Sequence, residues 1–213
     1  MSRCENINLM LDEAKTRERG SRERWLDAAY ELLIAGGIDA VKVMPLAKRL
    51  NLTRTGFYWF FEDISALHAA IIRRWEHQNT NMLVAHCEKS SATITEALFN
   101  LMDCWLNPEM FDAKLDLAIR NWARLDRALQ TKVDAADACR LRAVTEMFAH
   151  FDYTAEQAEV RGMTVMYTQI GYISMEVTED RTERLARVQH YVELFAGTPA
   201  SKREVQSFLD RNG

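Results

Sequence analysis

Residues 46–61 read LAKRLNLTRTGFYWFF, and this stretch predicts two short helices joined by a tight turn. Three apolar residues share one face of the first helix: Leu46, Ala47 and Leu50. Asn51 then ends that helix, because asparagine tolerates the left-handed backbone conformation that a sharp turn requires. Thr53 is a suitable N-cap for the second helix, which we expect to run from Arg54 to Phe61.

The second of these helices has two different faces. Phe57 and Phe61 lie four residues apart, a spacing that suits burial, and we expect both of them and Phe60 to belong to the core. Polar and aromatic side chains remain for the outer surface: Arg54, Thr55, Tyr58 and Trp59. A short helix of this kind after a tight turn has the layout of the helix-turn-helix of DNA-binding proteins.

The composition predicts an all-α protein. The 213 residues include 8 glycines and 3 prolines, and 48% hydrophobic and 27% charged residues are ordinary for a soluble globular protein. No apolar run reaches the roughly 18 residues that would span a membrane, and the charged N-terminus lacks the apolar centre of a signal peptide. We therefore expect a cytoplasmic protein, built from about nine helices.

Helical periodicity and capping residues divide the chain into three parts. We expect residues 1–20 to form a flexible arm, 21–75 a three-helix unit that contains the helix-turn-helix, and 76–213 a helical bundle. Besides the two helices of the opening stretch, the predicted helices are Arg22–Ala35, a long one from Ser65 to about Cys87, Thr93–Leu106, Asp112–Arg124, Asp126–Phe151, Thr154–Glu176, Arg181–Phe195 and Ser201–Leu209.

Charge is distributed unevenly along the chain. The net charge is −4, yet residues 15–75 hold eleven Lys and Arg against seven Asp and Glu, a net charge of +4. Binding to nucleic acid depends on the basic residues that reach phosphates and not on the charge of the whole chain. The basic segment is therefore compatible with DNA binding, and a solvated surface of mixed charge is the alternative.

The cysteines do not indicate a metal site. Cys4, Cys87, Cys104 and Cys139 lie far apart in the sequence, and in the cytoplasm we expect them to be reduced thiols. The adjacent pair His86–Cys87 supplies two ligands, which is too few for a zinc site. We expect neither a metal nor a cofactor.

The region from Arg22 to about Ile72 resembles the tetracycline-repressor (TetR) family of transcription regulators. A leading helix that ends at glycine, a helix-turn-helix with an aromatic pair, and a break with an aspartate before a leucine follow in the family's order without a gap. The matching residues are Ala28, Ala29, Leu32, Gly37, Val43, Leu46, Ala47, Leu50, Leu52, Thr53, Phe57, Tyr58, Trp59, Phe61, Asp63 and Leu67.

This resemblance implies a homodimer with an N-terminal DNA-binding domain and a C-terminal helical domain for ligand binding and dimerisation. Family members are usually repressors that a small-molecule effector releases from DNA. The implied partners are a palindromic operator of double-stranded DNA, an unknown small molecule and a second copy of the chain.

Three positions depart from the family pattern. Phe60 stands where a histidine is common, Ile64 where a lysine often contacts a phosphate, and Val43 where a hydroxyl residue usually caps a helix. Each change removes a polar or charged group. We therefore expect DNA binding that is weaker and less dependent on salt.

The sequence and the resemblance together predict the residues that contact DNA: Lys42, Lys48, Thr53, Arg54, Thr55, Gly56, Tyr58 and Trp59. Arg54 is the expected base reader, because a guanidinium can donate to O6 and N7 of guanine, and a contact to phosphate alone is the alternative. The hydroxyl groups suit phosphates, and Gly56 would allow a close approach of the helix. For Trp59, packing against the following helix is the alternative to a contact at the groove edge.

The bundle supplies candidates for a ligand site and a dimer interface. The candidate ligand-binding residues are His86, Trp105, Arg120, Trp122, Met147, Met166 and Tyr167, and ordinary core packing is the alternative for most of them. The candidate interface residues are Gln169, Gly171, Tyr172, Leu185, Val188, Tyr191 and Val192. The alternative is that the apolar residues of the predicted helix Arg181–Phe195, which are Leu185, Val188, Tyr191 and Val192, close the core of their own subunit.

Two other functions compete with a DNA-binding regulator. An enzyme is disfavoured, because the sequence has no glycine-rich phosphate loop, no HExxH or GxSxG motif, and no carboxylate pair within an apolar run. A helical ligand-binding or protein-interaction module that has lost DNA binding is the second alternative. Phe60 and Ile64 are the residues that favour it.

Overall fold

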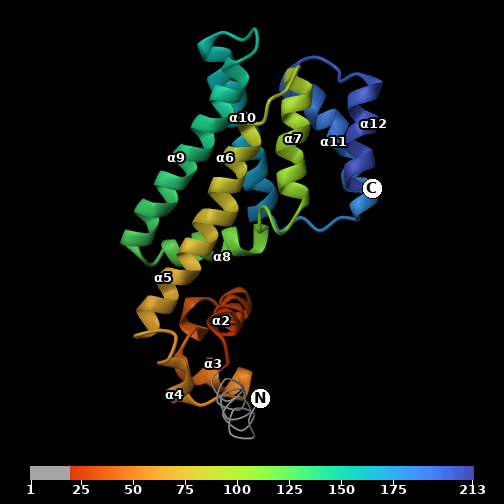
Figure 1. Cartoon of the computed structure of the whole chain (residues 1–213). Helices are drawn as coiled ribbons and strands as arrows, with labels where there is room; N and C mark the ends of the chain where they lie inside the picture. Colours follow the sequence, from red (N-terminus) through yellow and green to blue (C-terminus); the bar gives the residue numbers. More distant parts are fainter. Residues whose placement is uncertain (1–19) are drawn as a thin grey trace, which may run out of the picture. The chain divides into compact units, whose positions relative to one another are not determined.

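The computed structural model describes residues 20–213, which fold into helices joined by short connections (Figure 1). No strand occurs among these residues, so the predicted all-α class is confirmed. The predicted arm at 1–20 lies outside the described residues except for Gly20. The described chain divides into two compact units, an N-terminal unit that ends at Arg74 and a C-terminal unit that begins at Trp75.

The N-terminal unit contains the predicted helix-turn-helix. Its elements are α2 (Arg22–Gly36), η1 (Ile38–Ala40), α3 (Val43–Leu50), α4 (Arg54–Phe57) and most of α5 (Ile64–Trp75). Ser21 caps α2 by accepting from the N–H of Arg24, and Asp63 caps α5 by accepting from the N–H of Ala66 at 2.8 Å. Trp25 is fully buried and packs edge-on against Phe57, with ring centroids 5.4 Å apart.

The helix expected from Arg54 to Phe61 is shorter than predicted. It ends at Phe57, and a turn follows in which the N–H groups of Phe60 and Phe61 both donate to the Phe57 carbonyl, at 3.0 and 3.1 Å. Aromatic residues lose side-chain freedom in a helix, and the turn still buries Phe57 and Phe61 in a stacked pair with centroids 5.4 Å apart. The prediction that these two residues belong to the core is therefore confirmed.

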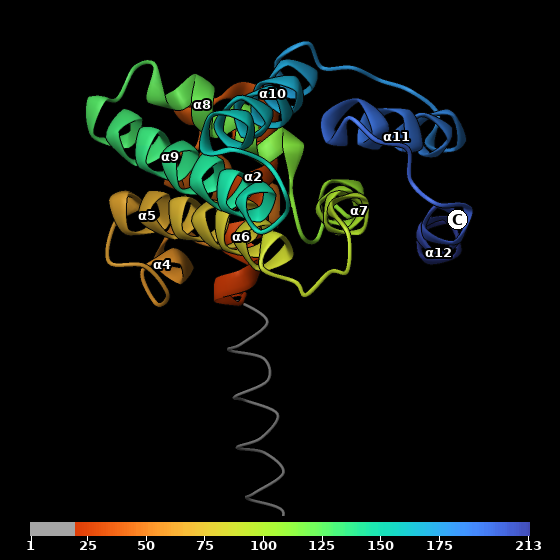
Figure 2. The same ribbon diagram turned by 90° about the horizontal axis from the view of Figure 1, so that it is seen from above.

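The C-terminal unit is a bundle of helices. They are η2 (Glu76–Asn81), α6 (Met82–Cys87), α7 (Ile94–Leu106), α8 (Ala113–Ala123), α9 (Arg127–Ala149), α10 (Ala155–Ser174), α11 (Arg181–Ala196) and α12 (Lys202–Asn212). Within this unit, α9 and α10 pack along each other, α6 packs against α7 and α9, and α11 and α12 pack against α7 on the side away from α9 (Figures 1 and 2). Thr154 and Gln157 form a capping box at the start of α10.

One local feature differs from the sequence predictions. The single long helix expected from Ser65 to Cys87 is interrupted by η2, which is π-helical. Within the bundle, Gly162 allows a close approach of α10 to α9, because a Cβ added there would lie 2.5 Å from the Thr145 hydroxyl of α9.

A buried ionic network centred on Asp116 joins η2, α8 and α9. The Asp116 carboxylate is fully buried and accepts from the Trp75 indole at 2.7 Å, from Arg120 at 2.7 Å and from Arg140 at 3.0 Å. Arg140 also donates to the Thr80 hydroxyl at 3.0 Å, which ties η2 to α9. Burial alone would raise the pKa of Asp116, but the two arginines outweigh burial and hold that pKa below its usual value.

The three described cysteines are free thiols. Cys87 and Cys104 are buried and Cys139 is exposed. Burial raises the pKa of Cys87 and of Cys104 to about 12, so both are unreactive at neutral pH. Within residues 20–213, no helix combines the length and the apolar character needed to cross a membrane.

Candidate nucleic-acid interface and ligand cavity

The turn between α3 and α4 has the predicted geometry. Asn51 adopts the left-handed conformation, with φ 53° and ψ 44°, and the N–H of Leu52 donates back to the Ala47 carbonyl at 2.9 Å. Thr53 caps α4, because its hydroxyl accepts from the N–H of Gly56 at 3.1 Å. The turn and the cap follow from residues within six positions of one another, and this is why the sequence could predict them.

Seven of the eight residues expected to contact DNA are exposed: Lys42, Lys48, Thr53, Arg54, Thr55, Tyr58 and Trp59. The eighth, Gly56, is buried, and its N–H is already bonded to Thr53. It therefore offers no surface to a partner. Trp59 is 61% exposed, which argues against the alternative that it is packed away against the following helix.

Arg54, the first residue of α4, forms a pair with Tyr58, the residue that directly follows α4. The Arg54 guanidinium donates to the Tyr58 hydroxyl at 3.3 Å and lies 5.8 Å from the centroid of its ring. A guanidinium has five N–H donors, so this pair leaves others available to a partner. The contact orients Arg54 along the helix surface at a small cost in side-chain entropy.

Neighbouring residues modify the expected interface. Arg49 forms an ion pair with Glu31 at 2.6 Å, so its charge is partly neutralised and it is a weaker candidate for a phosphate contact than Lys48. Met44, at the start of α3, is 62% exposed and was not among the expected contacts. Helical spacing could have identified it, because it lies opposite the buried face formed by Leu46 and Ala47.

The seven candidate ligand-binding residues do not form one site. His86, Trp105, Trp122, Met147 and Met166 are buried, Tyr167 is 61% exposed, and Arg120 belongs to the Asp116 network. Arg120 also pairs with Asp137 at 2.6 Å, so its charge is used within the bundle. The structure therefore assigns an internal role to Arg120 and places Tyr167 on the surface.

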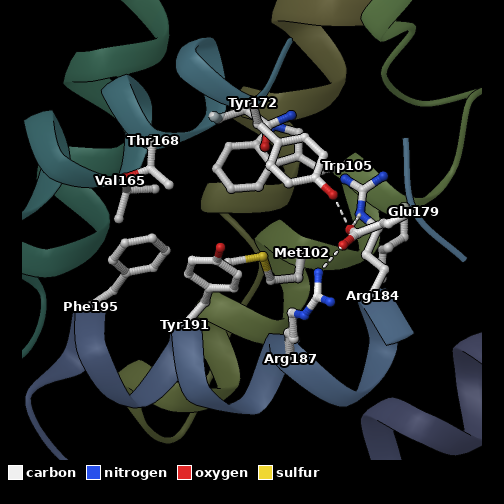
Figure 3. Close-up of a pocket in the computed structure, with 12 residues that line it drawn as sticks. Met102, Trp105, Val165, Thr168, Tyr172, Glu179, Arg184, Arg187, Tyr191 and Phe195 are labelled. Atoms are coloured by element: carbon white, nitrogen blue, oxygen red, sulfur yellow. Dashed lines mark hydrogen bonds and ion pairs between the residues drawn. The ribbon is translucent and has the colours of Figure 1, made fainter. Parts of the chain in front are cut away.

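A cavity lies between α7, α10 and α11, and Trp105 is the candidate residue that lines it (Figure 3). It has about 490 Å³ of empty space, counting the part open to solvent. Its apolar wall consists of Met102, Trp105, Leu106, Val165 and Phe195. Its polar and amphipathic residues are Thr168, Gln169, Tyr172, Glu179, Arg184, Arg187 and Tyr191. Below we call this space the α7–α10–α11 cavity.

Glu179 is the centre of the polar side of this cavity. Its carboxylate accepts from the Tyr172 hydroxyl and from Arg187, and Arg184 lies 3.8 Å away (Figure 3). Burial, together with the hydrogen bond to Glu179, raises the pKa of Tyr172 to about 12, so the phenol keeps its proton. The indole N–H of Trp105 has no hydrogen-bond partner among the described residues.

The expected dimer interface is partly wrong. Val188 and Val192 are 4% and 0% exposed and belong to the core of their own bundle, and Leu185 packs against that core. Three further candidates, Gln169, Tyr172 and Tyr191, line the α7–α10–α11 cavity, and Gly171 is half-buried. Of the expected interface residues, Tyr191 is the exposed apolar one, and the other exposed apolar side chains of α10 and α11 are Val160, Tyr167 and Leu194, with Met175 at the end of α10.

Comparison with solved structures gives two similar chains. The structure of a protein from Mesorhizobium loti MAFF303099, which is assigned as a TetR-family transcriptional regulator, matches with a TM-score of 0.53 at 13% identity, over 89% of this chain and 95% of that one. The TetR-family repressor AlkX from Dietzia sp. strain DQ12-45-1b, implicated in biodegradation of n-alkanes, matches with a TM-score of 0.45 at 18% identity, over 84% and 98%. No curated protein matches the sequence.

The N-terminal unit matches a known protein family. Residues 26–71, which run from the second turn of α2 into α5, match the family of bacterial regulatory proteins named tetR. The match contains the left-handed turn at Asn51, the Thr53 cap and the exposed face of α4. The N-terminal unit of the chain therefore matches the tetR family of bacterial regulatory proteins.

Proposed function

We propose that the protein is a homodimeric repressor that binds a palindromic DNA operator through α3 and α4, and that a small molecule in the C-terminal unit controls this binding. The observation that supports DNA binding most directly is the exposed surface of α4 and of the turn after it, where Arg54, Tyr58 and Trp59 follow a capped turn. A recognition helix of this motif enters the major groove with its first residues at the base edges. Arg54 is the first residue of α4.

The basic and hydroxyl groups around α4 have a separate role in this proposal. Lys42, Lys48, Thr53 and Thr55 are all exposed, and contacts of these types to phosphate position a protein on DNA without reading its sequence. Specificity would then rest mainly on Arg54, with Met44 available for apolar contact to a thymine methyl group.

Dimerisation is proposed through the exposed apolar residues of α10 and α11. Val160, Tyr167 and Leu194 are each more than 60% exposed, and a groove between these helices is lined by Val160, Arg161, Thr164 and Leu194 among others. Exposed apolar surface of this kind usually marks an interface. In a two-fold dimer the same patch lies on both subunits, which would place two copies of α4 on two half-sites of a palindrome.

Selection of bound sequences from random DNA tests the proposal. The full chain is incubated with the library, and its mass is measured by sedimentation under the same buffer conditions. We expect a dimer that enriches one palindrome. A folded dimer that enriches no sequence would instead favour the ligand-binding module without DNA binding, for which Phe60 and Ile64 are the supporting residues. A monomer would contradict the proposed interface.

A further inference from the structure

The α7–α10–α11 cavity contains a carboxylate of its own chain. Glu179 enters from the connection between α10 and α11, and its side chain is 9% exposed although it is charged. Its partners are the Tyr172 hydroxyl, the Arg187 guanidinium and, at 3.8 Å, Arg184. The arrangement of one hydroxyl and two guanidinium groups around a single carboxylate is a binding site for a carboxylate.

We propose that this cavity binds a small aromatic carboxylic acid, whose carboxylate replaces that of Glu179 on Tyr172, Arg184 and Arg187. The inference rests on the proposed function, because it names the chemical class of the small molecule that acts on the C-terminal unit. The apolar body of the ligand would lie against the wall that contains Trp105 and Phe195.

The charges around the site favour an anion over a neutral or cationic ligand. Arg184 and Arg187 face one carboxylate within the cavity, and Arg187 has a longer contact of 3.4 Å to Glu183, which is largely exposed. When Glu179 leaves, Arg184 and Arg187, whose side chains are 33% and 54% exposed, lose this carboxylate partner. A ligand carboxylate restores the hydrogen bonds of Tyr172 and Arg187 and the ion pair with Arg184, whereas an amide restores only part of these contacts and an amine is repelled.

The walls of the cavity favour an aromatic ligand. Trp105, Tyr172, Tyr191 and Phe195 supply four aromatic rings, and Met102 supplies a flexible thioether that adapts to ring edges. The Trp105 indole N–H is buried and has no partner among the described residues. A ligand with a second oxygen, such as a hydroxyl or carbonyl substituent, would gain affinity from this donor.

Glu179 is placed where it can move without breaking a helix. Residues 175–180 connect α10 to α11 and belong to neither helix. In this connection Met175 is 78% exposed and Val177 is 40% exposed, so neither is anchored in the core. Displacement of Glu179 therefore breaks the contacts of its carboxylate with Tyr172, Arg184 and Arg187. The ligand carboxylate would form the same contacts.

Direct titration of the full-length protein tests the inference without DNA. We would measure the binding of 2-naphthoate by isothermal titration calorimetry, with 2-naphthamide as the neutral control of the same shape. The expected result is that 2-naphthoate binds at least about tenfold more tightly than the amide, because charge-assisted hydrogen bonds exceed neutral ones. No binding of 2-naphthoate, or equal affinity for the two compounds, would overturn the inference.

Substitutions separate a binding role from a structural one. Arg184→Gln and Arg187→Gln should each weaken 2-naphthoate binding about tenfold, while Arg203→Gln, an exposed arginine on α12, provides the matched loss of charge and should change nothing. Glu179→Gln should tighten binding, because it removes the competing charge and keeps the shape of the side chain. If Glu179 only stabilised the fold, this variant would bind more weakly or unchanged, which would also contradict the inference.

A gel-shift assay with the selected operator keeps this inference distinct from the proposed function. DNA binding without affinity for 2-naphthoate would agree with the proposed regulatory function and would contradict the proposed class of ligand. Binding of 2-naphthoate without an effect on the DNA complex would support the carboxylate site and contradict its proposed control of DNA binding.

Discussion

The two units use charged side chains in opposite ways. In the N-terminal unit, Lys42, Lys48 and Arg54 are exposed on and beside the helix-turn-helix. In the C-terminal unit, Asp116 and Arg140 are fully buried and are bonded to each other. A buried ion costs several kcal/mol unless it is paired, so the second unit must satisfy its charges internally. The first unit leaves its charges for a partner made of phosphate and base edges.

The largest effect is expected where the buried charges lose their partner. Asp116→Asn keeps the shape of the side chain but leaves Arg140 in the core without an opposing carboxylate from α8. We expect a loss of about 3–5 kcal/mol in the free energy of unfolding, measured by urea denaturation at fixed protein concentration. Asp134→Asn, on an exposed part of α9, is the matched control and should change this free energy by less than about 0.5 kcal/mol.

The same network predicts how stability depends on pH. The pKa of Asp116 is lowered in the folded protein, so its contribution to stability is complete above the ordinary value of 3.8 and is lost as the pH falls through the folded pKa. The wild-type protein should therefore lose stability below about pH 4, and Asp116→Asn should lack that part of the loss. Parallel acid profiles for the two proteins would show that the carboxylate is not the group responsible.

A smaller effect is expected when an exposed charge of the N-terminal unit is removed. Arg54→Ala should leave the fold intact and weaken operator binding by about 1–3 kcal/mol, with a relaxed preference at one base pair, as measured by gel-shift titration. Arg73→Ala removes an equal charge from the exposed surface of α5 and should leave operator affinity unchanged. Equal losses in the two variants would mean that Arg54 contributes only charge.

The smallest effect concerns the apolar start of α5. Ile64 is half-buried as the first residue of this helix, and Ile64→Lys would supply a cation that can reach a phosphate. We expect the plot of log affinity against log salt to become steeper by about 0.9. Ile64→Gln, which adds polarity without charge, should leave the slope unchanged. An unaltered slope in the lysine variant would place residue 64 away from the DNA backbone.

The difference between the units also explains what the sequence could predict. Asn51 and Thr53 act on residues nearby in the chain, and both have the predicted geometry. In the C-terminal unit, the partner of Arg120 on α9 is Asp137, seventeen residues away. No local pattern indicates such a pairing, so the sequence alone does not distinguish a ligand-binding Arg120 from one that is paired within the bundle.

Helix periodicity failed for a related reason. Val188 and Val192 form an apolar stripe, which indicates that this face of α11 is buried. The stripe does not indicate whether its own bundle or a second subunit covers it. The structure shows that the core of the same bundle covers it. On α10, Tyr167 and Val160 are exposed while Val165 and Met166 are buried. Because apolar residues occur on both faces of this helix, their spacing does not identify which face is buried. The cavity was missed because Glu179, Arg184 and Arg187 lie in a charged segment that resembles ordinary solvated surface.

The attachment of Glu179 to the chain has a consequence for selectivity among anions. A tethered group competes for its site at an effective concentration of about millimolar or more, whatever the composition of the surrounding solution. Acetate and similar abundant anions match the carboxylate but bring no apolar surface to the Trp105 wall. Their affinity would therefore be too low to displace Glu179, and only an acid that also fills the aromatic part of the cavity would bind tightly enough to displace it.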